Sequence, residues 1–239
     1  MEDSMPSYHP PASSSVTTMH AILAKLGYEP PLPKQLSLLD EDKPKTSDVP
    51  LWYAGNLDIL SPRAVSVVGS RDVSDEGAKN AREVARELAQ SEVVVVSGLA
   101  AGVDTHALCS AIDCGGKVVA VIGTPLDCAM PSSNAVLQEA IYRDQLLISQ
   151  FPAGSAVRKW HFPARNRTMA ALSAGTLIVE ASDTSGTLHQ AAECVRMNRW
   201  LFVMRSTMRD ERLQWPKKYS ASYDRFVVID STDEILVRI

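Results

Sequence analysis

The chain has 239 residues, 45% of them hydrophobic, and a formal charge of −4 at pH 7. This composition fits one globular domain with a sizeable core. It excludes a polybasic protein, so any binding of a polyanion must come from a local patch. No apolar run reaches the ~18 residues of a membrane span, and we expect no contact with a membrane.

The four cysteines form no CxxC pair and have no histidine at the spacing of a zinc site. We therefore expect reduced thiols, no bound metal and a cytoplasmic protein. The N-terminus is polar and proline-rich, unlike a signal peptide.

Residues 1–50 hold eight of the fourteen prolines and form the first of two expected segments. A short amphipathic helix is predicted over 17–27, with Met19, Ile22, Leu23 and Leu26 on one stripe and Gly27 at its end. An extended linker is predicted over 29–50. For residues 1–14, disorder is an equally good interpretation.

The second segment, residues 51–239, alternates short apolar strands with helical spacing. The composition of these strands predicts a doubly wound, mostly parallel, Rossmann-like α/β sheet that is covered on both faces. The expected strands are 64–69, 93–98, 117–123, 145–151, 175–181, 200–204 and 225–230.

Ligands of such sheets bind beyond the carboxyl ends of the strands, so the turns there carry the functional prediction. After the first parallel strand come Gly69, Ser70 and Arg71, with Ser74 as the expected N-cap of the next helix. A helix N-terminus and an arginine together can hold a phosphate. An ordinary surface arginine is the alternative. The dinucleotide fingerprint GxGxxG is absent, and we expect no nicotinamide cofactor and no other cofactor.

Two more turns have the small residues that let backbone amides approach an anion. The first holds Ser97, Gly98 and Gly102, and Asp104 begins the helix after it, where a carboxylate favours the positive end of the dipole. The second turn is Ser185, Gly186 and Thr187, again at a helix start.

The heptapeptide HFPARNR (161–167) combines aromatic rings with arginines, and no Asp or Glu occurs between Asp144 and Glu180. We interpret it as a loop that meets an anion through Arg165 and Arg167, with Phe162 as a wall of the pocket. The alternative is that one of the two arginines holds the segment to the core through backbone carbonyls. Trp160 fits a stacking role and a core role equally well.

In order and spacing, GSRDVSDEG, SGLAAGVD, FPARNRTMAALS and VEASDTSGTL resemble the motifs of the DNA-processing protein A (DprA/Smf) family, over about residues 50–205. The resemblance implies an extended Rossmann fold that binds single-stranded DNA, forms a homodimer and loads a RecA-type recombinase in natural transformation. It implies no catalysis. The DNA pocket would be lined by Gly69, Ser70, Arg71, Ser97, Gly98, Gly102, Phe162, Arg165, Asn166, Arg167, Ser185, Gly186 and Thr187.

The chain departs from the family pattern in several places. Leu108 and Gln150 replace a usual His and Glu, and Arg205-Ser206 replace a Pro-Gly. We expect the N-terminal helical domain to be reduced and the C-terminal winged helix to be absent. These departures bear on recombinase loading and transformation rather than on DNA binding.

Two other functions stay open at this point. The SGTL turn also resembles the cytokinin-activating phosphoribohydrolases, whose catalysis needs a Glu at the position of Gln190. Glu193, one helical turn further on, could replace this carboxylate only if the helix had a different orientation. The other alternative is a nucleotide sensor that binds a small ligand in the same pocket. The mixed charges of the segment 207–225 indicate a solvated excursion, although Lys217 and Lys218 could extend the path of a DNA strand. DNA sequence preference stays open.

Overall fold

The computed structural model describes residues 7–28 and 49–239, and the predicted linker over 29–50 lies almost wholly outside this part of the chain. Its centre is one nine-stranded sheet in the order β1-β2-β6-β5-β4-β3-β7-β8-β9. The strands from β6 to β9 in this order pair in parallel, whereas β1 and β2 add an antiparallel edge. The prediction of a doubly wound, mostly parallel sheet is confirmed.

All seven strands expected from the sequence are present; β8 has the expected bounds, and the other six are shorter than their apolar runs. Their residues are mostly buried on both faces, which explains the continuous apolar runs. They are β3 (Ala64–Val68), β4 (Val94–Ser97), β5 (Val118–Ile122), β6 (Leu146–Ser149), β7 (Gly175–Ile178), β8 (Trp200–Met204) and β9 (Phe226–Ile229).

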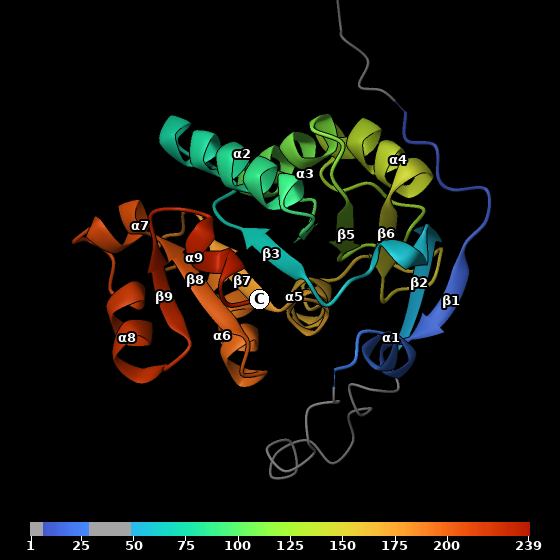
Figure 1. Cartoon of the computed structure of the whole chain (residues 1–239). Coiled ribbons are helices and arrows are strands. Elements are labelled where there is room, and N and C mark those ends of the chain that lie inside the picture. The colour runs from blue at the N-terminus through green and yellow to red at the C-terminus, as the bar shows by residue number, and fades with distance from the viewer. Residues whose placement is uncertain (1–6, 29–48) are drawn as a thin grey trace, which may run out of the picture.

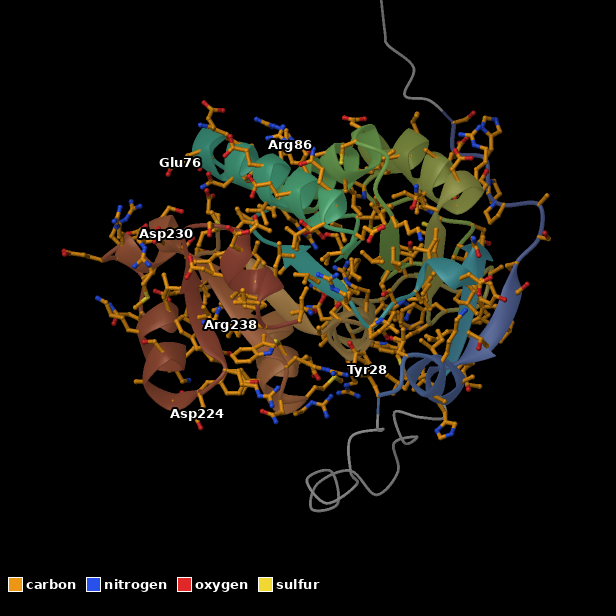
Figure 2. All side chains as sticks on the ribbon, in the orientation of Figure 1. Tyr28, Glu76, Arg86, Asp224, Asp230 and Arg238 are labelled. Carbon is orange, nitrogen blue, oxygen red and sulfur yellow. The ribbon has the colours of Figure 1, made fainter. Side chains whose placement is uncertain are left out.

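Helices cover both faces of this sheet (Figure 1). One layer packs α2 (Asp75–Gln90), α3 (Val103–Asp113) and α4 (Ala135–Asp144) against one face, and α9 (Asp233–Leu236) joins the same core. The opposite face carries α1 (Met19–Lys25), α5 (His161–Leu172), α6 (Thr187–Arg196) and α8 (Trp215–Ser222). The five-residue helix α7 (Arg205–Arg209) follows β8. Side chains fill the space on either side of the sheet, with Arg86 of α2 on one side and Tyr28 on the other (Figure 2).

Two cores result from the alternation of side chains along the strands. Val94 and Val96 face the core under α5 and α6, whereas Val93 and Val95 face the core under α2 and α3. The sheet is thus buried on both sides, and its exposed functional surface is left to the loops at the strand ends.

The N-terminal residues join this same sheet and core. The predicted helix over 17–27 is present as α1, with Met19, Ile22 and Leu23 buried. The strand β1 (Ser15–Thr18) pairs with β2 (Pro50–Gly55), and neither strand was expected from the sequence. Gly55 has a φ of 101°, and a Cβ there would lie 2.1 Å from the carbonyl oxygen of Gln145, so this turn requires glycine.

Residues 7–14, for which disorder was an alternative, have specific contacts with the domain. The Tyr8 hydroxyl donates to the carbonyl of Leu126 at 2.6 Å and accepts from Gln138 at 2.8 Å. Burial raises the pKa of Tyr8 to about 12, so its phenol stays neutral. The backbone amide of His9 donates to Glu139 at 2.8 Å. Residues 1–6 lie outside the described part of the chain.

The expectation that residues 207–225 form a solvated excursion is wrong in its centre. The segment contains α8, whose Trp215 is 4% exposed and donates its indole N–H to the carbonyl of Ala181 at 3.0 Å. Asp183 accepts from the backbone amides of Gln214 and Trp215 and so fixes the start of α8. A buried aromatic and a capped helix start therefore tie this segment to the exit of β7.

The N-terminal contacts give a stability prediction. Tyr8→Phe should lower the free energy of unfolding in urea by about 1–2 kcal/mol, because the carbonyl of Leu126 loses its donor in a partly buried place. His9→Ala is the matched control: its side chain is exposed, and we expect a change within about 0.5 kcal/mol. Equal stability of Tyr8→Phe and the wild type would mean that residues 7–11 do not pack on α4.

Candidate functional site

The exits of β3 and β7 lie side by side and are tied to each other by hydrogen bonds. The Ser70 amide donates to the carbonyl of Glu180 at 2.7 Å, and the Thr187 hydroxyl donates to the carbonyl of Gly69 at 3.0 Å. A Cβ on Gly69 would lie 2.8 Å from the oxygen of Glu180 and 2.6 Å from Val103, so the close approach depends on glycine. This junction fixes the floor of the candidate site.

On the β3 side, the loop leads into α2 through the N-cap that the sequence predicts. The Ser74 hydroxyl accepts from the amide of Gly77 at 3.0 Å and hydrogen-bonds the carboxylate of Glu180. Arg71 is exposed ahead of this cap, with its guanidinium carbon 5.9 Å from the ring centre of Phe162. Arg71 is therefore free to move toward an anion above the junction.

On the β7 side, a hydroxyl-rich turn begins α6. The Ser185 hydroxyl accepts from the amide of Thr187 at 3.1 Å and donates to the Thr187 hydroxyl at 2.9 Å. Gln190, one turn into the helix, is 1% exposed and donates to the hydroxyl of Thr176 at 3.1 Å. Its Oε1 is buried without a hydrogen-bond partner, although the residue lines the site.

The HFPARNR segment is helical, which corrects its interpretation as a loop. It forms the start of α5, with Pro163 in the first turn, where proline needs no amide donor. Phe162 projects against Gly123 at the exit of β5, since a Cβ on Gly123 would lie 2.8 Å from its ring. The helical start places Phe162 as a wall of the site and turns Arg165 inward.

Arg165 is buried, with 8% of its surface exposed, and donates to the carbonyl of Val121 at 3.1 Å. A Cβ on Gly98 would lie 1.4 Å from its Nη1, so glycine makes room for the guanidinium. Asp104 is also buried and accepts from the amides of Gly98 at 2.9 Å and Ala100 at 3.4 Å. These contacts hold the turn after β4 in place beneath the site.

The two buried charges stabilise each other. Burial lowers the pKa of the Arg165 guanidinium, and the carboxylate of Asp104 acts against this shift. Burial raises the pKa of Asp104, with Arg165 and the backbone amides acting against it. Arg165 therefore contributes a buried positive charge beneath the surface of the site, and its side chain is not a mobile surface group.

Together these elements enclose a hollow of about 470 Å³, called the main hollow below. Of the thirteen residues predicted to contact DNA, it brings together Gly69, Ser70, Arg71, Phe162, Arg165, Asn166, Ser185, Gly186 and Thr187. Gly98 lines a smaller adjoining hollow of about 110 Å³, the side hollow, which shares Arg71, Phe162 and Arg165 with the main one.

Three predicted residues do not line either hollow. Ser97 is fully buried and donates to the carbonyl of Val67 at 2.7 Å. Gly102 has a φ of 76°, and a Cβ there would lie 2.2 Å from the carbonyl oxygen of Ser70, so it serves the packing of the turn. Arg167 points toward α6, with its Nε 3.7 Å from a carboxylate oxygen of Glu193.

The main hollow also has residues that the sequence reasoning did not assign to it. Asp72, Ser182, His189 and Gln190 contribute polar groups, and Asp104 lies at its floor. The sequence already places Gln190 at the position of a hydrolase carboxylate, three residues after Thr187, and this helical spacing indicates a face shared with Thr187. The hollow thus mixes two arginines with acidic residues and is less cationic than the sequence suggested.

The groups that line the site suit the binding of a phosphate. These are the Gly186 amide at the start of α6, the Arg71 guanidinium and small hydroxyls, and Phe162 offers an aromatic face beside them. Within residues 7–28 and 49–239, no cluster of His, Cys, Asp and Glu is arranged to hold a metal ion. In the same ranges, no helix is both long and apolar enough to cross a bilayer.

Comparison with known proteins identifies the family. Residues 27–236 match the family model of the DNA recombination-mediator protein A. The DNA processing protein DprA of Streptococcus pneumoniae is 42% identical over 180 residues, which are 73% of this chain and 64% of that protein. The chain thus spans less than two thirds of the length of this curated relative.

Two solved structures share the fold. That of DprA from Streptococcus pneumoniae superposes with a TM-score of 0.73 at 36% identity, covering 85% of this chain and 73% of the other. That of DNA processing protein A from Helicobacter pylori, described for its unique single-stranded DNA binding mode, gives 0.71 at 28% identity, with 86% and 91% covered. The resemblance seen in the sequence motifs is confirmed, and the chain belongs to the DNA recombination-mediator protein A family.

Proposed function

We propose that this protein binds single-stranded DNA at the carboxyl edge of its sheet and acts there as a recombination mediator. The observation that carries the proposal is the main hollow, where the exits of β3 and β7 present Arg71, the start of α6 and Phe162 to one space. A binder of single strands without strong sequence choice needs cations for the backbone and rings for the bases. The description of the Helicobacter pylori relative as a single-strand binder supports the same function.

Arg71 and the backbone amide of Gly186 would contact phosphates, and Phe162 would stack on a base. Ser70, Asn166 and Ser185 would add hydrogen bonds from the walls. Arg165 would act from behind the surface, because its guanidinium is buried against Val121 and Gly98. The proposal drops Ser97, Gly102 and Arg167 as direct contacts.

Family membership supports two wider parts of the proposal. The protein would form a homodimer and load a RecA-type recombinase onto the strand that it holds. It would work in the cytoplasm, where its four free cysteines stay reduced. We propose no catalytic role.

A nucleotide sensor is the alternative that the site favours next, because Gln190 lines a hollow of nucleotide size and its buried Oε1 has no hydrogen-bond partner. A phosphoribohydrolase fits less well. Gln190 replaces the needed carboxylate, and Glu193 pairs with Arg196 at 2.5 Å on a part of α6 that does not line the hollow. Incubation with nucleoside monophosphates, with chromatographic detection of free base, distinguishes the hydrolase, which alone releases base.

The protein should bind single-stranded DNA more tightly than duplex, and the affinity should fall with salt. A flexible strand can enter the hollow, whereas a stiff duplex holds its phosphates too far apart. Contact with two to four phosphates implies a log–log salt slope of about −1.4 to −2.8 for a single strand. Anisotropy titrations at several salt concentrations measure this. Equal affinity for duplex, or a thermal shift with free nucleotide and no strand binding, would favour the sensor.

Arg71→Ala should weaken single-strand binding and reduce the magnitude of the salt slope by about 0.7, because one phosphate contact is lost. Arg167→Ala is the matched control, since Arg167 lies on α5 but lines neither hollow. We expect its affinity to stay within about twofold of the wild type, because Arg167 pairs with Glu193 of the protein itself, and loss of this partly exposed pair should leave the fold intact. A larger loss from Arg167→Ala than from Arg71→Ala, with both proteins folded, would place the DNA elsewhere.

A further inference from the structure

Among the described residues, Trp160 is the one aromatic residue in the set of exposed large apolar side chains. Its relative exposure is 59%, and the others in this class are valines and a methionine. The residue precedes α5 and takes no part in either hollow. Single exposed apolar side chains are common on protein surfaces; Trp160 differs from them in the rings that hold it and in the charges beside it.

The indole is held in position although it is exposed. Phe151 and His161 stack on each other with centroids 3.6 Å apart and planes at 8°. The indole stands almost perpendicular to this pair, at 78° to Phe151 and 82° to His161, with centroids 5.6 Å and 4.3 Å away. A ring fixed before binding loses little conformational entropy when a ligand stacks on it.

The sheet order places Trp160 in line with the two hollows. The main hollow lies over β3 and β7, and the side hollow reaches Gly123 at the exit of β5. Phe151 follows β6, the next strand in the sheet, and packs against the indole. A single DNA strand that passes from the main hollow over the side hollow therefore reaches Trp160 next.

The charges along the sheet edge favour a DNA path from the main hollow toward β6 over a path toward β8. On the β8 side, a third hollow of about 690 Å³, the acidic hollow, adjoins the main one through Ser182 and is lined by Glu76, Glu180, Asp183 and Asp210. Its one arginine, Arg212, is paired with Asp210 at 2.7 Å. Figure 2 shows Glu76 at the end of α2 nearest α7.

Around Trp160 the charges have the other sign. Arg158 and Lys159 directly precede it, both are exposed, and neither has an ion pair with any acidic residue in the described ranges. A polyanion is repelled from the acidic hollow and attracted to this end of the sheet edge. The group that contacts the exposed indole is therefore part of an anionic chain that also carries flat apolar groups.

We propose that Trp160 is a base-stacking site for a nucleotide of the bound single strand that has left the main hollow toward β6. The proposal rests on the proposed function and gives the strand a direction along the sheet edge. It assigns the nucleobase, rather than the phosphate, as the group that Trp160 recognises.

The test compares two oligomers of equal length and charge, one of deoxythymidine and one fully abasic. Trp160→Ala should lower the affinity for the thymidine oligomer by about 5- to 150-fold, the range for loss of one base–aromatic stack. The loss should persist at high salt, and Trp160→Phe should keep most of the affinity. The abasic oligomer should bind the wild type and Trp160→Ala equally, because it has no base to stack.

Val136→Ala, an exposed residue on α4, is the control and should change neither affinity. Trp160→Leu, which keeps apolar bulk without a flat π face, should behave like Trp160→Ala and provides a second variant should the alanine protein fold poorly. Undiminished thymidine binding by both variants overturns the proposal, as does an equal loss on the abasic oligomer. A wild type that binds no single strand at all removes the proposed function itself, and the stacking site with it.

Discussion

The parallel pairing of β3 with β7 is the constraint on which the site depends. From β3 the chain builds outward through β4, β5 and β6, and then returns to β7 on the other side of β3 before adding β8 and β9. The loops after β3 and β7 leave in opposite directions, which opens a crevice at the switch point of the sheet. The hydrogen bonds from Ser70 to Glu180 and from Thr187 to Gly69 keep the two loops in register. Without this pairing, Arg71 and the start of α6 would not share a space.

The crevice is supported from below by a buried pair of charges. Arg165 and Asp104 are both buried, and each would be costly alone. Their mutual attraction and their bonds to Val121, Gly98 and Ala100 offset part of that cost. The pair fixes the turn after β4 and places positive charge behind the surface. In the proposed single-strand site, Arg165 would thus serve the binding surface without touching the ligand.

The sequence predicted the parallel strands well because burial on both faces leaves continuous apolar runs such as VVVV at 93–96. It missed β1 and β2 because neither has such a run: the edge strand β1 is mostly exposed, and β2 begins with Pro50 and ends with Gly55. The buried Trp215 was missed because its burial depends on Ala181 and Asp183, which are distant in sequence.

The site was predictable in its turns but not in the orientation of its side chains. Small residues after strands indicated the loops at 69–71 and 185–187 correctly as neighbours of one hollow. HFPARNR is helical although its charges suggest a solvated loop, and the start of α5 lacks a capping side chain, since Trp160 occupies the N-cap position. In the helix, Arg165 turns inward to the carbonyl of Val121 and Arg167 points toward Glu193. Which arginine turns inward depends on these partners, which are distant in the sequence.

Hydrogen–deuterium exchange with and without a saturating deoxythymidine oligomer tests the central claim most directly, because it locates the bound strand on the chain. Protection should appear at 69–72, 160–166 and 182–189, and the segment 206–213 at the acidic hollow should exchange as in the free protein. Protection confined to the outer face of α2 and α3, or to α8 and α9, with none at the exits of β3 and β7, would contradict the account.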